Sequence, residues 1–584
     1  MGAKWRQALA GAVNTWVEGS LACDPMAYAA SLNQTPESDE VIDVPVLIVG
    51  AGPTGLVASC LLSRLGVRSL TVERHPGTTI YPRALGINTR SMEILRSLGL
   101  EAAVRRAAFH AVTVMARSTT LMDPHPEISP SFATPPSAAS PSEWTTCPQL
   151  ELEPILLHDA ASHPEAELRF NTEMISLRQT AGGVHACIQE RTSGRRTEVR
   201  CRYLVAADGA RSSTRQLLGI GLEGPGELGH NVNIHFTAPL AERLPHPPIF
   251  VHRVENEQVR GLFFPTGERR WMLVLGYNAE RGESAADFTE ERCIELVRAG
   301  SGIADLPVEI IGISPWTAQG DVATRWRDGS AFLAGDAAHR MTPAGALGMN
   351  TGIQDAHNLA WKLAAVLRGW AGEDLLDTYE SERRPVACAN MERTVTLLTH
   401  NMVDTGHRTA RDFDLGFEYA SGALIADGTL QTHSDGDYVP SARPGRRLPH
   451  AWVGARGRRV STLDVTGPHF TVLVEHRERR WRDATRRVAK EMRVPVRCAA
   501  VRAADATFLR DVMGIAHSGA VLVRPDGHVA WRCAELAADT TAADAAADLR
   551  VVIGRVLSIA APTNGTARTP HREPHTATAL LAAD

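Results

Sequence analysis

The sequence predicts an α/β protein built around a Rossmann-like nucleotide-binding domain. Three observations support this fold class: an apolar run leading into a glycine-rich turn, two later apolar runs that each end in paired Asp and Gly, and an intervening block rich in strand-forming residues. The first two are typical of parallel strands whose carboxyl ends face a ligand. The third indicates a mostly antiparallel sheet inserted into that domain.

The first apolar run, Val44–Val49, has the continuous hydrophobicity of a strand buried on both faces of a parallel sheet. It leads into Gly50–Gly55 (GAGPTG), which matches GxGxxG and opens a helical pattern that ends at Gly66. Glu73 ends the next strand, 18 residues after Gly55, where its carboxylate can accept hydrogen bonds from a ribose. Because this charge would repel a 2′-phosphate, we expect the ADP part of FAD or NAD rather than NADP.

The two later runs place a carboxylate directly after a strand. Asp208 stands in YLVAADGARSSTR, and Asp336 stands in FLAGDAAHRMTPAGALGMN. Such a carboxylate points into the crevice where α/β sheets bind ligands. Asp208 has a second interpretation, as the cap of a helix that begins near Ser212. Since one ADP group needs one fingerprint, two further carboxylates predict a ligand that extends well beyond ADP.

The remaining pattern divides into strands, one long helix and a C-terminal α/β domain. Strands are expected at 168–170, 183–189, 197–205 and within 232–277, and a helix with one buried face is expected at 351–370. Ser441–Trp452 has Pro and Gly punctuation and is expected to be a linker with solvated arginines, Arg443–Arg447. Beyond it, STLDV, HFTVLVEH and GAVLVRPDGHVAWR are strand candidates, and RWRDATRRVAKEM is a helix candidate.

Bulk composition excludes several classes of function. The 584 residues include 61 Lys and Arg against 66 Asp and Glu, so the net charge of −5 does not favour nucleic acid or an acidic membrane as a partner. No two of the nine cysteines form CxxC, so neither zinc binding nor dithiol redox chemistry is expected, and a reduced, cytoplasmic setting fits. No metal site is predicted. No apolar run approaches the roughly 18 residues of a transmembrane helix, so no membrane association is expected.

Three motifs in this order resemble the single-component FAD-dependent aromatic hydroxylases typified by p-hydroxybenzoate hydroxylase. They are GxGxxG at Gly50–Gly55, DGxxSxxR at Asp208–Arg215, and GDAAH followed by PxGxxGxN within Gly335–Asn350. The phrases CPQLELEPIL, RPGRRLPH and VLVRPDGHVAWR are similar to the phenol and dichlorophenol hydroxylase branch and to flavoproteins acting on polycyclic natural products. The resemblance implies the p-hydroxybenzoate hydroxylase fold with a C-terminal thioredoxin-like domain.

The resemblance also implies cofactors and roles. FAD would be bound, with NAD(P)H as a transient co-substrate and O₂ as the oxygen source. Asp336 would bind the ribityl chain, Pro343–Asn350 would wrap the isoalloxazine, and Arg83 would contact the moving flavin. The implied cofactor-binding residues are Gly50, Gly52, Pro53, Thr54, Gly55, Glu73, Arg74, Arg83, Gln149, Asp208, Gly335, Asp336, Pro343, Gly348, Met349 and Asn350.

These motifs set the expected domain organisation. Residues 1–40 would form an N-terminal extension, 41–225 and 316–400 the FAD-binding domain, and 226–315, with part of 110–147, an inserted substrate-binding sheet. Residues 401–440 would form a helical or linker region, 441–560 the thioredoxin-like domain, and 561–584 a disordered tail. The last domain lacks CxxC, so we expect it to pack or form dimers rather than carry redox chemistry.

The leading functional hypothesis is a monooxygenase that uses NAD(P)H and O₂ to hydroxylate an aromatic, polycyclic natural product through a flavin C4a-hydroperoxide. The sequence departs from relatives at Leu85, where many carry an acidic residue, and at Ala346-Leu347, where many carry Gly-Gln. No catalytic base can therefore be named, and Arg83 is the one candidate catalytic side chain. His339 is expected to pack and hydrogen-bond. Two alternatives stay open: a flavoprotein that channels an unstable intermediate, and a flavin reductase or dehydrogenase.

Overall fold

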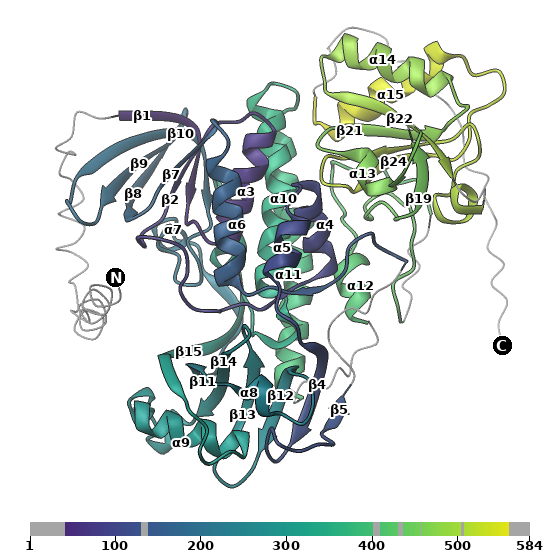
Figure 1. Ribbon diagram of the computed structural model, residues 1–584. Helices are drawn as coiled ribbons and strands as arrows, with labels where there is room; N and C mark the ends of the chain where they lie inside the picture. The colour runs from purple at the N-terminus through teal and green to yellow at the C-terminus, as the bar shows by residue number, and fades with distance from the viewer. Residues whose placement is uncertain are drawn as a thin grey trace, which may run out of the picture.

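The computed structural model describes residues 41–129, 138–400, 409–429, 436–455, 457–503 and 507–559. A parallel sheet with its helices, a second sheet below it and a C-terminal domain beside it make up the molecule (Figure 1). The expected N-terminal extension and C-terminal tail lie outside the described residues. Within the described ranges, no helix combines the length and apolarity needed to cross a membrane.

The first sheet has the predicted Rossmann-like core. Its main path runs β16-β17-β10-β1-β2-β7, and β1 lies parallel to both β10 and β2, as β10 does to β17. These strands are β1 (Val41–Val49), β2 (Ser69–Val72), β7 (Ala166–Arg169), β10 (Arg196–Ala206), β16 (Arg327–Asp328) and β17 (Ala331–Leu333). Since parallel strands end on the same side, the segments after β1, β10 and β17 come together at one edge.

Helices cover this sheet, and an antiparallel pair extends it. The helix α3 (Pro53–Arg64) contacts both α10 (Gly348–Leu367) and α6 (Gln149–Ala161), and the long α11 (Thr378–Thr399) contacts α10 (Figure 1). The pair β8 (Thr172–Thr180) and β9 (Gly183–Glu190) joins the sheet through β10. The largest apolar cluster of the molecule lies between these layers.

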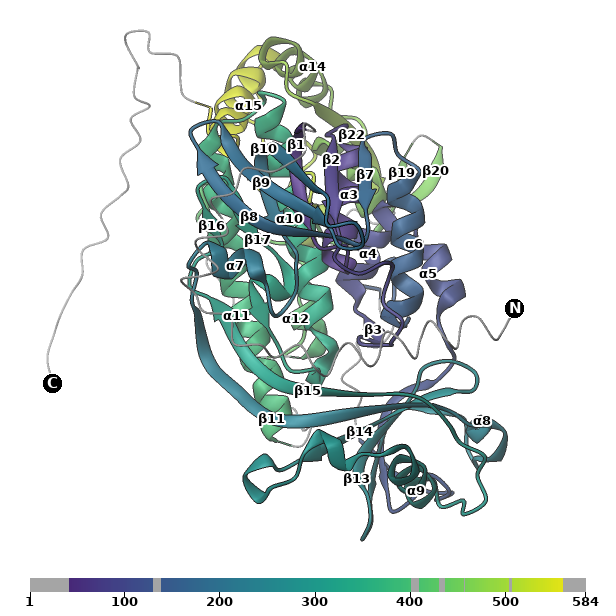
Figure 2. The same ribbon diagram turned by 90° about the vertical axis from the view of Figure 1, so that its left-hand side faces the viewer.

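The second sheet confirms the expected inserted, mostly antiparallel block and extends beyond it. Its order is β18-β15-β11-β14-β13-β12-β4-β5, and Figure 2 shows the long β11 and β15 crossing below the first domain. The strands are β4 (Val112–Ser118), β5 (Glu127–Ser129), β11 (Leu222–Thr237), β12 (Ile249–Glu255), β13 (Arg260–Pro265), β14 (Arg270–Tyr277), β15 (Glu309–Ala323) and β18 (His339–Arg340). Thus β15 continues past residue 315, because its pairing with β11 continues to Ala323.

The two faces of this sheet have different neighbours. Val232, Ile234 and Phe236 of β11 share an apolar cluster with residues of α9 (Glu290–Ser301). Because strand side chains alternate, His235 lies on the opposite face, which is turned toward the first domain. Contact across that face is confirmed by a second cluster in which Leu85 packs on sheet residues.

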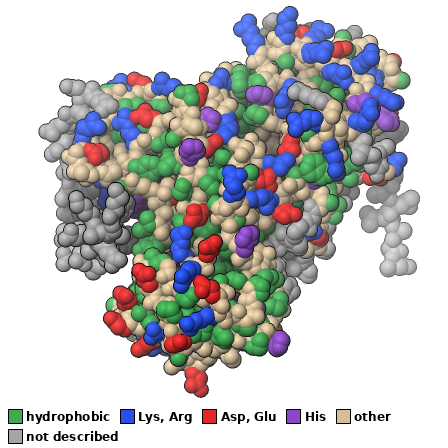
Figure 3. All heavy atoms as spheres, viewed as in Figure 1, with side chains coloured by type: hydrophobic (Ala, Val, Ile, Leu, Met, Phe, Trp, Pro, Cys, Tyr) green, Lys and Arg blue, Asp and Glu red, His purple; other side chains and the backbone are tan. Residues whose placement is uncertain are grey.

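The C-terminal domain has a thioredoxin-like arrangement. The parallel pair β21 (Phe470–Glu475) and β22 (Val496–Ala503) is joined by α14 (Arg480–Met492) and followed by an antiparallel hairpin and α15 (Ala542–Val556). The hairpin strands are β23 (Ala520–Val523) and β24 (Val529–Cys533), and β19 (Trp452–Ala455) and β20 (Arg458–Ser461) complete the sheet. Lys and Arg side chains gather on the outside of this domain (Figure 3).

One expected strand in this domain is wrong. Ser461 ends β20, and TLDVT forms the short helix α13 (Thr462–Thr466). The Ser461 side chain accepts from the backbone of the first turn, and Asp464 reaches back to the Ser461 backbone, as in a capping box. This local cap outweighs the strand propensity of Thr and Val.

The expectation of a solvated linker at Ser441–Trp452 is also wrong. Arg447 is only 1% exposed, forms an ion pair with Glu93 and donates to Ala139 O at 2.9 Å. Burial opposes ionisation of Glu93, but the charges of Arg447 and Arg90 lower the pKa of this carboxyl to about 2. The linker is therefore held to the first domain by paired charges excluded from water.

Candidate functional site

The site lies at the edge of the first sheet where the segments after β1, β10 and β17 meet. After β1, Gly50 has a φ of +103°, and a Cβ on it would lie 2.3 Å from Ala207 O. A Cβ on Gly55 would lie 2.0 Å from Gly50 O, whereas one on Gly52 would meet no atom within 4 Å. Two glycines are therefore required by packing, and Gly52 borders open space.

The helix α3 begins at this turn without a side-chain cap. Its N-cap residue is Gly52, and Pro53 occupies the first helical position. The N–H groups of Thr54 and Gly55 lie in the first turn, where no intrahelical acceptor exists. Open space beside Gly52 and an uncapped positive helix end together fit a phosphate-bearing group.

Glu73 lies directly after β2, beside the glycine turn. Its Oε2 accepts from Ala51 N at 2.8 Å, and its Oε1 accepts from His75 N at 2.9 Å. The carboxylate is half-buried and anchored at the position that the sequence predicts. Arg74 is exposed, and its carbonyl accepts from Arg191 Nη1 at 3.2 Å.

Asp208 caps a helix, as its second interpretation predicts. Its Oδ2 accepts from Thr214 N at 2.9 Å and from Thr214 Oγ1 at 2.8 Å, in the first turn of α7 (Ser213–Leu217). The last residue of the motif, Arg215, is buried and donates to Ala337 O at 3.0 Å. DGxxSxxR therefore shapes its own loop and ties it to the GDAAH segment.

Asp336 is exposed although protein surrounds it. Desolvation by its neighbours raises the pKa of its carboxyl, against the opposing charges of His339 and Arg83. Desolvation of an exposed side chain describes a carboxyl inside an open hollow. Gly335, just before it, has a φ of +60°, and a Cβ there would lie 2.5 Å from Thr54 Oγ1. The first and last motifs are therefore in direct contact.

A buried hydrogen-bond network supports the GDAAH loop from behind. Asp355 Oδ2 accepts from Gly335 N at 3.1 Å and lies 2.8 Å from His339 Nε2. Asp355 Oδ1 accepts from Arg383 Nε at 2.8 Å, and the side chains of Asp355, His339 and Arg383 are all 0% exposed. His339 thus has the packing and hydrogen-bonding contacts expected from the sequence. Sequence reasoning missed Asp355 and Arg383, which lie on buried faces of helices.

The glycine loop that follows ends at the start of α10. Its N-cap, Leu347, has no side-chain capping bond, so the N–H groups of Gly348, Met349 and Asn350 occupy an uncapped first turn. The Asn350 side chain points elsewhere: its Oδ1 accepts from Asn88 N at 3.0 Å, and its Nδ2 donates to Gly86 O at 3.0 Å. Pro343 is exposed at the other end of this loop.

Ala346 in this loop has a left-handed backbone. Its φ is +55°, and the preceding Gly345 has a φ of +81°. An L-residue in this region costs roughly 1–2 kcal/mol that glycine avoids. A left-handed backbone at a non-glycine residue therefore places strain in the loop next to α10.

The predicted neighbours Arg83 and Gln149 lie on adjoining segments. Gln149 N donates to Ala84 O at 2.7 Å, and Gln149 Nε2 donates to Glu153 Oε1 at 2.7 Å. Arg83 is exposed, and its charge acts on Asp336 and on His235 of the second sheet. This loop therefore joins the hollow around Asp336 to the face of the second sheet.

Leu85, two residues later, is 7% exposed and packs against Met115, Phe250 and Met272. A carboxylate at position 85 would be buried in this apolar cluster without a partner there, at a substantial cost in free energy. The departure at Leu85 thus agrees with its surroundings.

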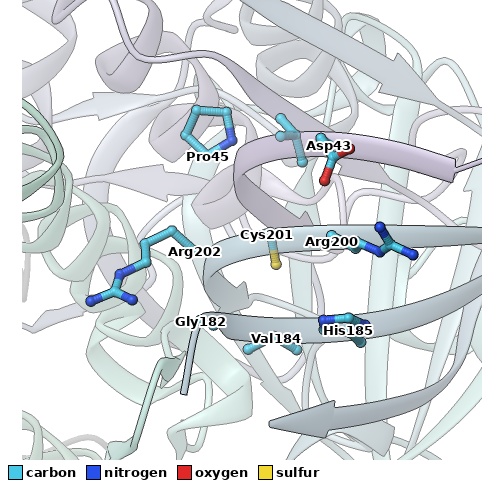
Figure 4. Close-up of a pocket in the computed structure, with 10 residues that line it drawn as sticks. Asp43, Pro45, Gly182, Val184, His185, Arg200, Cys201 and Arg202 are labelled. Carbon is cyan, nitrogen blue, oxygen red and sulfur yellow. The ribbon is translucent and has the colours of Figure 1, made fainter. Parts of the chain in front are cut away.

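A surface pocket of about 410 Å³ lies away from this site (Figure 4). It is lined by the first half of β1 and by β9 and β10, including Asp43, His185 and Arg200. His185 and Arg200 both contact Glu198, at 3.2 and 2.9 Å. The glycine turn follows the far end of β1, so this pocket does not belong to the site described above.

Comparison with known proteins identifies the family. Residues 43–394 match the FAD binding domain family, and residues 441–557 match the aromatic-ring hydroxylase C-terminal family. The chain is 38% identical to tetracenomycin B2 monooxygenase-dioxygenase of Streptomyces olivaceus, with 88% of this chain and 99% of that protein covered. It is likewise 38% identical to an aklavinone 12-hydroxylase of Streptomyces purpurascens, with coverages of 88% and 99%.

A solved structure of aklavinone-11 hydroxylase with FAD and aklavinone has 36% sequence identity and a TM-score of 0.80, covering 90% of this chain and 100% of that one. The chain therefore belongs to the FAD-dependent aromatic-ring hydroxylases. It is a flavin-dependent monooxygenase with a Rossmann-like FAD-binding domain and a thioredoxin-like C-terminal domain.

Replacing Asp336 tests its role in the site. We expect Asp336→Ala to weaken FAD binding about 10- to 100-fold, because hydrogen bonds to a charged group contribute roughly 1.5–3 kcal/mol each. Flavin fluorescence titration of the apoprotein measures this change. Asp305→Ala, which alters an exposed carboxylate in the turn between α9 and β15, is the matched control. Unchanged FAD affinity in Asp336→Ala would overturn the assignment.

Strain at Ala346 is tested by replacing alanine with glycine at this position and, as a control, at an unstrained helical position. Ala346→Gly should leave the free energy of unfolding unchanged or raise it by up to about 1 kcal/mol, since it relieves the left-handed backbone. Ala547→Gly, on the exposed face of α15, should lower it by about 0.5–1 kcal/mol. Urea denaturation of the holoprotein measures both, and equal losses at the two positions would show that Ala346 is unstrained.

Proposed function

We propose that this protein hydroxylates a polycyclic aromatic polyketide with NAD(P)H and O₂. The overall change is ArH + O₂ + NAD(P)H + H⁺ → ArOH + H₂O + NAD(P)⁺. The similar tetracenomycin and aklavinone enzymes support this substrate class. The structural observation that carries the proposal is the apolar face of the second sheet, which is turned toward the FAD-binding domain and packed against Leu85.

The proposed FAD contacts follow the geometry of the three loops. Gly50–Gly55 and the start of α3 would bind the pyrophosphate, with Glu73 and Arg74 beside the adenosine ribose. Asp336 would accept hydrogen bonds from the ribityl chain, near Gln149 and Arg83. The N–H groups of Gly348, Met349 and Asn350 would face the pyrimidine edge of the ring, beside Pro343. The flavin supplies two-electron reduction and reaction with O₂.

The apolar cluster between the second sheet and the segments packed on it would bind and shield the substrate. The apolar cluster consists of Leu85, Met115, Phe250, Val251 and Met272, with half-buried Phe109, Ala111, Trp144, Leu262, Phe264 and Val274 packed against it. The aromatic and aliphatic side chains of this cluster suit a flat, apolar ring system. A surface of this kind also excludes water from the reacting atoms.

Three further expectations extend the proposal. NAD(P)H would bind transiently, because only the GxGxxG at Gly50–Gly55 opens a helix, whereas the later matches, Gly219–Gly224 and Gly224–Gly229, overlap β11. Described cysteines are all free, which fits a reduced, cytoplasmic setting. The thioredoxin-like domain would pack against the FAD-binding domain or form a homodimer. Measurement of the molecular mass in solution distinguishes a monomer from a dimer.

Labelled oxygen separates hydroxylation from the two alternative functions. With FAD-loaded protein, NADPH and a panel of hydroxylated anthraquinones and naphthacenequinones, at least one compound should stimulate NADPH oxidation about tenfold or more. Under ¹⁸O₂ its product should carry one ¹⁸O atom, as mass spectrometry shows. Stimulated oxidation without ¹⁸O in any product would support channelling of an intermediate, and a reduced product formed without O₂ would support a reductase.

A further inference from the structure

The second sheet contains a buried histidine that the FAD contacts above do not use. His235 on β11 is 2% exposed, and neither ring nitrogen has a hydrogen-bond partner among the described residues. Native proteins rarely bury a polar group without a partner, because the lost hydrogen bonds to water are not replaced. Such a group in a ligand-binding region indicates a partner supplied by a ligand.

The ring of His235 faces the loop that reaches the FAD site. The Tyr81 ring stacks on it, with centroids 5.0 Å apart and planes 23° from parallel. Gly312 pairs with His235 on the neighbouring strand, and a Cβ there would lie 2.7 Å from the Tyr81 hydroxyl. Tyr81 therefore covers the His235–Gly312 pair, two residues before Arg83 on the same loop.

His235 borders the apolar cluster of the second sheet. Its other ladder partner is Met272, which packs against Leu85 in that cluster. Two residues earlier on the same face, Asn233 accepts from Trp316 Nε1 at 2.7 Å. An aromatic ring lying on the apolar cluster would thus have polar side chains along one edge, with His235 nearest the cluster.

Burial and the charge of Arg83 lower the pKa of His235 to about 4. The imidazole is therefore neutral at neutral pH, with a lone pair on one nitrogen that can accept a hydrogen bond. A hydroxyl on an aromatic ring is a strong donor for that lone pair.

We infer that His235 accepts a hydrogen bond from a ring hydroxyl of the substrate and so selects hydroxylated polycyclic aromatics. This inference rests on the proposed function, because it places the substrate between the apolar cluster and the cofactor. His235 also fixes which edge of the ring system faces the second sheet. The residue is thereby a specificity-determining contact in a site where Leu85 provides no polar group.

Binding of a matched pair of ligands to the FAD-loaded full chain tests this role. The probes are 2,6-dihydroxyanthraquinone, whose hydroxyls lie away from the ring carbonyls, and its dimethyl ether, titrated through the change in flavin absorbance. Wild type should bind the dihydroxy compound about tenfold or more tightly, because a site built around a hydrogen bond rejects the analogue that lacks the donor. His235→Phe keeps a ring against Tyr81 and should reduce this preference to about threefold or less, whereas His235→Gln retains an acceptor and should keep most of it.

Thermal unfolding distinguishes this role from a structural one. Because His235→Phe removes buried nitrogens without partners, its Tm should equal or exceed that of wild type. His185→Phe, on the remote β9, is the control and should keep the full preference. Equal or no binding of the two probes by wild type, or a full preference in His235→Phe, would overturn the inference. A hydroxyl preference without any oxygenated product would contradict the proposed function and leave this inference standing.

Discussion

Asp355 accepts hydrogen bonds in a fully buried position between the FAD-binding loops and the helices behind them. Its carboxylate contacts Gly335 N, His339 and Arg383. Although burial acts against it, the charges of Arg383 and His339 lower the pKa of Asp355, so the group is held ionised. Gly335 in turn touches Thr54 of the first motif. The position of Asp336, and hence of the middle of the proposed FAD site, therefore depends on this one carboxylate.

The same network extends into the C-terminal domain through α11. Glu382, adjacent to Arg383, lies 2.8 Å from Lys362 of α10 and 2.6 Å from Arg524 of the β23–β24 turn region. Arg90 donates to Asp526 O in that turn at 2.6 Å. These groups are buried, so losing any one partner would leave a charge without compensation. A thioredoxin-like domain without a redox motif thus acts as a brace for the helices beneath the FAD loops.

Local sequence patterns predicted those parts of the site that are formed by residues close together in the sequence. GxGxxG and its strand and the capping alternative for Asp208 are examples. Contacts between distant segments were not predictable in this way. Arg447 was expected in solvent because its partner, Glu93, lies 354 residues away in the sequence, and His235 has no local signature beyond strand alternation. Asp355 was missed because the periodicity of apolar residues in a helix indicates which face is buried, but not which loop packs against that face.

The FAD dissociation constant of Asp355→Asn is the measurement that tests the central role of this carboxylate most directly. The substitution keeps size and shape, removes the charge that pairs with Arg383, and replaces one of the two acceptor oxygens with an NH₂ group that cannot accept a hydrogen bond from Gly335, His339 or Arg383. We expect FAD affinity to fall about tenfold or more while the far-UV circular dichroism stays that of wild type, because the loop loses its support and the fold keeps its sheets. Asp464→Asn, at the exposed cap of α13, serves as the control. FAD binding by Asp355→Asn equal to that of wild type would contradict the account.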